Sequence, residues 1–172
     1  VYSGHKPQVG DVVAVRITHV NEDYSKLDLE GGELVQLQQG DVVLGVLGNR
    51  SGVKGYIGEV PDSLDKGGSI EFLGSGGIFG RYISGARELD QPCEAELLGY
   101  VSHNSTILNT RDFGTDHARE VEADADLVAV VASRMDAGKT TLASKLIEGL
   151  SQQYDIASLK LTGSARERDR LQ

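Results

Sequence analysis

The chain of 172 residues is 39% hydrophobic and 25% charged, and its formal net charge at pH 7 is −9. This composition is typical of a soluble globular protein rather than of a disordered chain. The acidic balance argues against a general nucleic-acid-binding surface, because phosphate backbones are bound mainly by clustered Lys and Arg. The longest strongly apolar run, residues 127–132, is much shorter than the roughly 20 residues that span a bilayer, so we expect no membrane helix.

The single cysteine, Cys93, cannot form an intramolecular disulfide, and the first residues contain no apolar run typical of a secretion signal. We therefore expect a cytoplasmic protein in which Cys93 is a buried, inert thiol. The chain begins with Val1 rather than Met, and it ends at Gln172 in a stretch typical of the beginning of a helix. We expect the chain to be incomplete.

Short β-rich runs separated by glycine occupy the first hundred residues, at 12–17, 34–37, 42–47, 55–57, 69–72 and 95–101. In the first run Val13, Val15 and Ile17 alternate with Ala14 and Arg16, which is typical of a strand with one buried face. Short strands at this spacing predict a small antiparallel barrel or sandwich. We assign this all-β domain to residues 1–120.

One short motif occurs twice in this region, first as Gly10-Asp11-Val12-Val13 and then as Gly40-Asp41-Val42-Val43. Two interpretations are open. The motif marks two equivalent barrel strands, each entered through a Gly-Asp turn, or it is a chance recurrence of residues that are common in turns.

A glycine-rich segment at residues 74–81 is predicted to be a hairpin turn or a bulge. Its alternative interpretation is a backbone nest that binds an anion, with Arg81 and Arg87 as the nearby cations. Residues 102–124 are polar and end in a run of acids, which is typical of a connector between domains.

The period of the hydrophobic pattern changes after residue 120. Residues 127–132 are a continuous apolar run, as expected for a parallel strand buried on both faces. A turn and a predicted helix at 139–150 follow, and then a second apolar run at 156–161. The order of strand, loop, helix and strand predicts a parallel sheet. The predicted fold class is thus α+β overall, with an all-β barrel-like domain followed by the start of an α/β P-loop domain at 121–172.

The loop between the first apolar run and the helix matches most of the P-loop pattern G-x-x-x-x-G-K-[ST], with Ser133 in place of the first glycine. Gly138 allows the backbone to approach a phosphate closely. Lys139 supplies a charge for the β- and γ-phosphates, and Thr140, assisted by Thr141, offers a hydroxyl to Mg²⁺. The alternative is that these residues merely begin a helix. The predicted nucleotide-binding residues are Ser133, Arg134, Asp136, Ala137, Gly138, Lys139, Thr140 and Thr141.

Residues 132–141 resemble the variant P-loop of dethiobiotin synthetase and its relatives. Lys160-Leu161-Thr162-Gly163 is similar to a Lys-x-Thr-Gly segment in a related P-loop family that includes D-glutamate N-acetyltransferase. The resemblance implies that Lys160 reaches the transferred phosphate or an acidic substrate, and that Thr162 lies at the mouth of the site. It covers only residues 126–172.

The sequence therefore predicts an enzyme that uses ATP, or GTP, with Mg²⁺ to activate or phosphorylate a small carboxylate-bearing substrate, with Lys139 and Lys160 as catalytic residues. A second hypothesis is acyl transfer from coenzyme A, whose phosphates the same loop would hold. A third is a regulatory or assembly factor that nucleotide switches between two conformations and whose β module binds a partner. A homodimer is expected by analogy with P-loop relatives. The substrate, and the residue that would hold Mg²⁺ from a later strand, are not specified.

Overall fold

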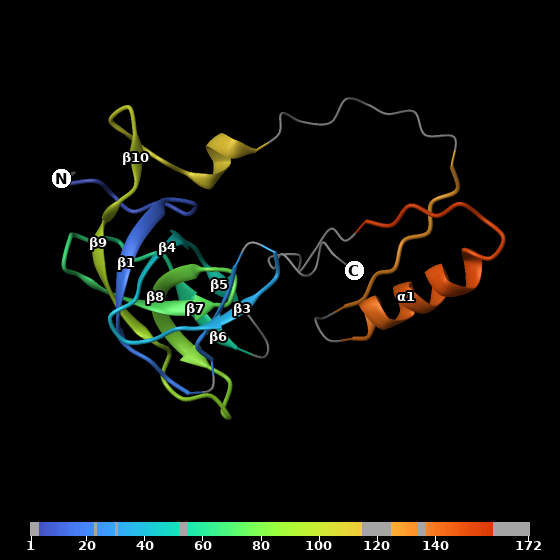
Figure 1. Cartoon of the computed structure of the whole chain (residues 1–172), viewed down its shortest axis with the longest axis horizontal. Helices are drawn as coiled ribbons and strands as arrows, with labels where there is room; N and C mark the ends of the chain where they lie inside the picture. Colours follow the sequence, from blue (N-terminus) through green and yellow to red (C-terminus); the bar gives the residue numbers. More distant parts are fainter. Residues whose placement is uncertain are drawn as a thin grey trace. The chain divides into compact units, whose positions relative to one another are not determined.

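The computed structural model describes residues 4–22, 24–29, 31–51, 55–114, 125–133 and 137–159. The chain divides into two compact units, and the described residues up to 114 belong to the first unit and residues 125–159 to the second (Figure 1). The predicted domain boundary at residue 120 stays a prediction.

The first unit is built on one large sheet whose strand order is β4-β1-β9-β7-β8-β6-β5. Neighbouring strands are antiparallel, and an additional parallel pairing joins Val46 and Leu47 of β4 to Ile78 and Phe79 of β8. This pairing closes β4, β1, β9, β7 and β8 into a barrel, which β6 and β5 extend. The strands are β1 (Val12–His19), β4 (Val42–Leu47), β5 (Arg50–Ser51), β6 (Tyr56–Glu59), β7 (Ser69–Gly74), β8 (Ile78–Gly85) and β9 (Glu94–Tyr100).

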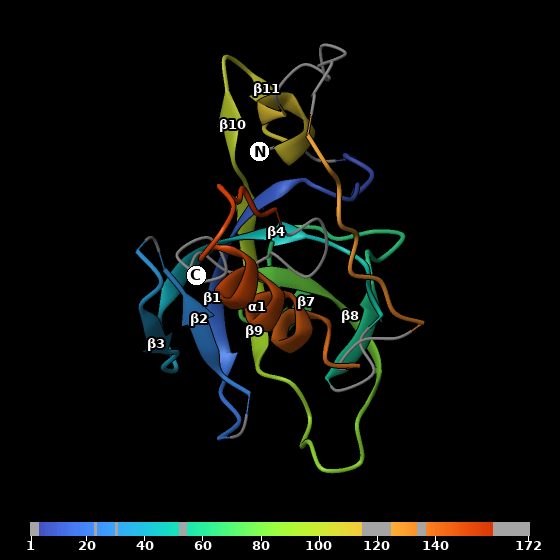
Figure 2. The ribbon, with the colours of Figure 1, turned by 90° about the vertical axis from the view of Figure 1, so that its right-hand side faces the viewer.

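Two small hairpins and a short helix complete the first unit. The hairpins pair β2 (Lys26–Asp28) with β3 (Leu34–Gln36), and β10 (Ser102–His103) with β11 (Thr106–Ile107). The 3-10 helix η1 (Thr110–Phe113) follows β11. Figure 2 shows β10, β11 and η1 together beyond one end of the barrel strands.

The barrel is filled by the inward side chains of its strands. Val13, Val15 and Ile17 of β1 are at most 1% exposed, as the alternating pattern predicted. The rings of Phe72 and Phe79 meet edge to face at the centre, with their centroids 5.4 Å apart. Burial of these apolar side chains supplies the main favourable contribution to folding.

The repeated Gly-Asp motif forms two equivalent turns. Gly10 and Gly40 adopt φ values of 97° and 96°, which favour glycine because it has no Cβ. In both turns the aspartate N–H donates to the carbonyl oxygen of the glutamine three residues earlier, at 3.2 Å for Asp11 and 3.1 Å for Asp41. The aspartate carboxylate accepts a hydrogen bond from the N–H of the same glutamine, at 2.8 Å in each turn. The repeat is therefore structural, and the interpretation as a chance recurrence is wrong.

The strands that follow the two turns pair with each other symmetrically. The antiparallel register of β1 and β4 places Ala14 opposite Leu44, which lie at equivalent positions of the repeat. The N–H of Gly10 donates to the carbonyl of Leu47 at 2.8 Å, and the N–H of Gly40 donates in the same way to Ile17, also at 2.8 Å. Each turn therefore secures the end of the other strand, and the pair has local twofold symmetry.

The glycine-rich segment at 74–81 contains the turn between β7 and β8, as predicted, with a register irregularity between Phe72 and Gly74. The sequence did not predict β8, which begins at Ile78 within this segment and continues to Gly85. Arg81, one of the two cations considered for an anion site here, forms an ion pair with Glu59 instead.

The predicted fold class is wrong in the second unit. Its helix α1 (Lys139–Leu150) has the predicted bounds. Residues 127–132 and 156–159, however, form no strand, and Leu127 and Val131 are 92% and 84% exposed. An apolar run forms a strand only when a partner pairs with it, and no described residue pairs with either run. The described residues thus contain no helix-flanked parallel sheet, and an α/β P-loop domain is excluded as the fold described here.

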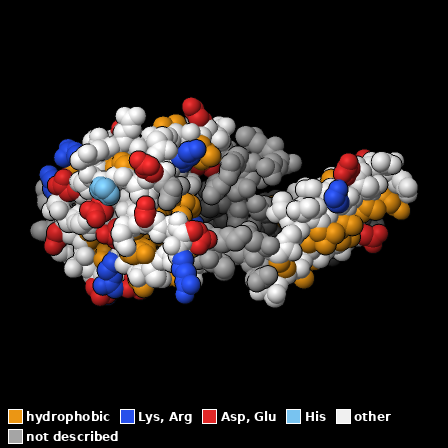
Figure 3. All heavy atoms as spheres, turned by 90° about the horizontal axis from the view of Figure 1, so that it is seen from below, with side chains coloured by type: hydrophobic (Ala, Val, Ile, Leu, Met, Phe, Trp, Pro, Cys, Tyr) orange, Lys and Arg blue, Asp and Glu red, His pale blue; other side chains and the backbone are white. Residues whose placement is uncertain are grey.

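The helix α1 has an apolar side that the second unit leaves uncovered. Leu142, Leu146 and Leu150 are 53%, 36% and 40% exposed, and no residue of α1 is buried. Figure 3 shows hydrophobic side chains gathered along the smaller unit.

We predict that Gly45→Ala destabilises the barrel by about 1–3 kcal/mol. A Cβ at Gly45 would overlap the ring of Phe79, which lies in the closely packed core. Gly99 in β9 is the matched control, because no atom lies within 4 Å of the position of its Cβ. Urea unfolding should show Gly99→Ala within about 1 kcal/mol of the wild type. Equal destabilisation by both substitutions would contradict this packing.

Candidate functional site

The residues predicted to bind nucleotide are only partly described. Ser133, Ala137, Gly138, Thr140 and Thr141 are exposed and Lys139 is half-buried, whereas Arg134, Asp136 and Lys160 lie outside the described residues. Gly138 precedes α1 in the left-handed conformation, with φ 81°, and as the N-cap residue it offers no side chain to accept from the first helical N–H groups.

This arrangement does not make a P-loop. A P-loop joins the end of a buried strand to the beginning of a helix, and residues 127–132 are not a strand. The interpretation as a P-loop or Walker A motif is therefore wrong. The roles given to individual residues of this segment, and the use of ATP and Mg²⁺, stay predictions from the sequence.

A polar pocket of about 510 Å³ lies at the beginning of β1 in the first unit. Its volume is within the range of roughly 300–1,000 Å³ that is typical of small-molecule sites. Its lining comes from the segment before β1, from the β10–β11 hairpin and from η1, and consists of His5, Gln8, Asp11, Ser105, Thr106, Ile107, Asn109, Arg111 and Asp112.

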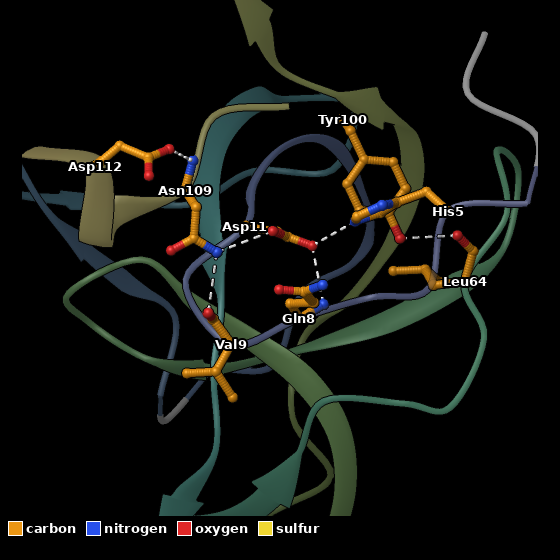
Figure 4. Close-up of polar contacts among 8 residues, drawn as sticks. All are labelled: His5, Gln8, Val9, Asp11, Leu64, Tyr100, Asn109 and Asp112. Carbon is orange, nitrogen blue, oxygen red and sulfur yellow. Dashed lines mark hydrogen bonds and ion pairs between the residues drawn. The ribbon is translucent and has the colours of Figure 1, made fainter. Parts of the chain in front are cut away.

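Asp11 lines this pocket and stands at the centre of the hydrogen-bond network drawn in Figure 4. The residue is 3% exposed. Its Oδ2 accepts hydrogen bonds from Nε2 of His5 at 2.7 Å and from the N–H of Gln8 at 2.8 Å, and its Oδ1 accepts one from Nδ2 of Asn109 at 3.0 Å. A buried carboxylate is tolerated only when such donors replace water. The three donors therefore fix Asp11 and are fixed by it.

Asn109 connects the segment after the barrel to the turn before β1. Its Nδ2 also donates to the carbonyl of Val9 at 3.1 Å, and its side-chain oxygen accepts from the N–H of Arg111 at 3.1 Å. The carboxylate of Asp112 in turn accepts from the N–H of Asn109 at 3.2 Å, which completes a capping box at the start of η1. Residues 102–114 are thus part of the first unit, so this part of the predicted connector at 102–124 is wrong, and residues 115–124 lie outside the described residues.

His5 is held from two sides. Nε2 donates to Asp11, so the hydrogen bond fixes the orientation of the imidazole. The imidazole meets the ring of Tyr100 edge to face, with the centroids 4.8 Å apart. The phenolic hydroxyl of Tyr100 donates to the carbonyl of Leu64 at 3.0 Å. Burial, followed by the negative charges of Asp11 and Asp65, raises the pKa of Tyr100 to about 12.

Comparison of the two Gly-Asp turns distinguishes the contacts that form the turn itself from the contacts that belong to the pocket. Asp41 makes the same hydrogen bonds within its own turn as Asp11, but it is half-exposed, and no side chain of the described residues donates a hydrogen bond to it. A Cβ at Gly10 would overlap the side chain of Asn109, whereas the space around Gly40 is open to 4 Å. Among the described residues, His5 and Asn109 are additions that only the first turn has.

The sequence patterns did not predict this site. They indicated Asp11 only as a turn residue, and they indicated no role for His5 or Asn109. The repeated Gly-Asp motif was the one sequence signal that pointed to Asp11. In the structure, the second copy of the turn shows that the contacts of Asp11 with His5 and Asn109 are not part of the turn itself. Cys93, by contrast, is buried as predicted, and its burial raises the pKa of the thiol.

Comparison of the chain with protein-family models, with curated proteins and with solved structures found no match. The resemblance of residues 126–172 to dethiobiotin synthetase-like proteins therefore stays a prediction.

The described part of the chain holds no group of three or more His, Cys, Asp or Glu side chains placed to bind a metal ion. None of its helices combines the length and the hydrophobicity that crossing a membrane requires.

We predict that Asp11→Ala lowers the free energy of unfolding by about 2–3 kcal/mol, because it leaves the donors of His5, Gln8 and Asn109 without their acceptor. Asp41→Ala, the matched control, removes only the hydrogen bond of an exposed turn and should cost about 0.5–1.5 kcal/mol. Chemical denaturation of both variants measures the difference. Equal losses would show that Asp11 is no more than a turn residue.

We also predict that Tyr100 titrates later than an ordinary tyrosine. The folded protein holds the phenolic proton up to about pH 12, whereas the unfolded chain releases it near pH 10. The contribution of Tyr100 to stability is therefore constant below about pH 10 and falls between about pH 10 and 12. Absorbance titration of the wild type and of Tyr100→Phe identifies this phenol, and Asp11→Asn should lower its pKa while Asp41→Asn leaves it unchanged. A Tyr100 pKa near 10 would contradict the burial of the phenol.

Proposed function

We propose that the first unit is a binding module for a small, neutral ligand rich in hydroxyl or amide groups, and that the Asp11 pocket receives it. The observation that supports this most is the preorganised polar lining around a buried, fully hydrogen-bonded carboxylate. Preorganised groups lose little conformational freedom when a ligand binds, which favours affinity.

The charges of the pocket favour a neutral ligand over an ion. Sites that select ions concentrate charge of one sign, whereas this lining mixes the carboxylates of Asp11 and Asp112 with the guanidinium of Arg111. Both carboxylates already accept hydrogen bonds from the protein, so neither is offered as an open partner for a cation.

The remaining lining supplies donors and acceptors in the forms that hydroxyl-rich molecules use. Ser105 and Thr106 offer hydroxyls, and Gln8 offers a side-chain amide. Ile107 adds one apolar contact. A few directed polar groups of this kind fix the orientation of a ligand and provide its specificity.

NMR titration of the full chain tests this proposal, with neutral monosaccharides, inorganic phosphate and a small diamine as probes. We expect at least one monosaccharide to shift the amide signals of residues 105–112 in a saturable way, and phosphate and the diamine to leave these signals unshifted. Saturation by phosphate or diamine alone, or by none of the probes, would contradict the proposal.

A pair of threonine substitutions provides the control. Thr106→Val removes one hydroxyl from the pocket and should weaken monosaccharide binding by about 2- to 10-fold. Thr18→Val removes an exposed hydroxyl from β1, outside the pocket lining, and should leave binding unchanged.

A further inference from the structure

A second pocket, of about 350 Å³, lies at the other end of β1, where the chain leaves the strand. Its volume is also within the range of roughly 300–1,000 Å³ that is typical of small-molecule sites. The described residues that line it belong to the end of β1, the loop after it and the loop before β9, and they are His19, Val20, Asn21, Glu22, Asp90 and Gln91. This pocket shares no described residue with the lining of the Asp11 pocket.

The side chain of Asn21, which is 6% exposed, joins the two loops that carry this lining. Its Nδ2 donates to the carbonyl of Gln91 at 2.8 Å and to the hydroxyl of Tyr56 at 2.6 Å. The same hydroxyl donates to the carbonyl of Asp90 at 3.0 Å, and Oδ1 of Asn21 accepts from the N–H of Tyr24 at 2.9 Å. The two loops are therefore fixed relative to each other, and a ligand does not have to order them when it binds.

With His19 neutral, the charges of this second pocket all have one sign. Glu22 on the first loop and Asp90 on the second loop are exposed, and the described lining contains no Lys or Arg. Among the described residues, no group donates a hydrogen bond to either carboxylate. Both carboxylates are therefore open to a ligand, in contrast to the carboxylates of the Asp11 pocket, and a cleft with charge of one sign concentrates ligands of the opposite sign.

The arrangement of these acidic groups favours an extended cation over a metal ion. His19, Glu22 and Asp90 are not placed to hold one metal ion together. We infer that the second pocket binds an aliphatic diamine, with one ammonium group donating to the carboxylate of Glu22 and the other to that of Asp90. The methylene chain between the ammonium groups lies in the pocket, where Val20 supplies an apolar contact.

NMR titration of the full chain tests this inference with putrescine and cadaverine, two diamines that differ in the spacing of their ammonium groups. Butylamine, which carries one charge, and Mg²⁺, whose charge is at one point, are the comparison probes. We expect at least one diamine to shift the amide signals of residues 19–22 and 90–91 in a saturable way, and to bind at least about fivefold more tightly than either comparison probe. Absence of saturable shifts, or a smaller margin over butylamine or Mg²⁺, would overturn the inference.

Substitutions then locate the two ammonium positions. Glu22→Gln and Asp90→Asn each remove one charge and keep the shape of the side chain, and each should weaken diamine binding by about 2- to 5-fold. Glu88→Gln is the matched control, because it removes an exposed carboxylate of the loop before β9 that is not in the pocket lining, and it should leave binding unchanged. Undiminished binding by either pocket variant, or an equal loss with Glu88→Gln, would also overturn the inference. The signals of residues 105–112 report separately on the Asp11 pocket, so this inference and the proposed function can fail independently.

Discussion

The buried carboxylate of Asp11 is the group on which the polar pocket depends. It joins His5 before the barrel, the turn that contains Gln8, and Asn109 after the last barrel strand. These bonds are shielded, since Asp11 is 3% exposed, and water competes poorly for them in such a setting. One side chain thus assembles a pocket from segments far apart in the sequence.

The two Gly-Asp turns show how a local motif acquires a wider role. Their backbone geometry, their glutamine contacts and their pairing with the opposite strand are equivalent. The motif alone therefore accounts for the entry into β1 and β4. The two turns differ in their tertiary contacts. Among the described residues, a histidine and an asparagine donate hydrogen bonds to the carboxylate of Asp11 only. This difference between two otherwise equivalent turns is the physical reason why we propose the ligand site at Asp11 and not at Asp41.

Sequence patterns predicted those elements of the fold that interactions between residues close in the sequence determine. Alternation identified β1, β-rich composition identified β4, and helical spacing identified α1 with its observed bounds. β8 was missed because Gly80 and Gly85 interrupt its pattern. Contacts with other strands and loops favour glycine at both positions, since a Cβ at Gly80 would lie 2.9 Å from the backbone oxygens of Gly48 and Glu59, and a Cβ at Gly85 would lie 3.0 Å from the ring of Tyr56. Residues 127–132 were misassigned because apolar character does not specify a pairing partner.

The candidate site was less predictable than the fold, because Asn109 is 98 positions from Asp11 and no periodicity connects the two residues. A double-mutant cycle on Asp11→Ala and Asn109→Ala measures their connection most directly. If the carboxylate assembles the pocket, the free energies of unfolding should show a coupling of about 1–3 kcal/mol between the two sites. Additive losses, within about 0.5 kcal/mol, would show that the two side chains act independently and would contradict this account.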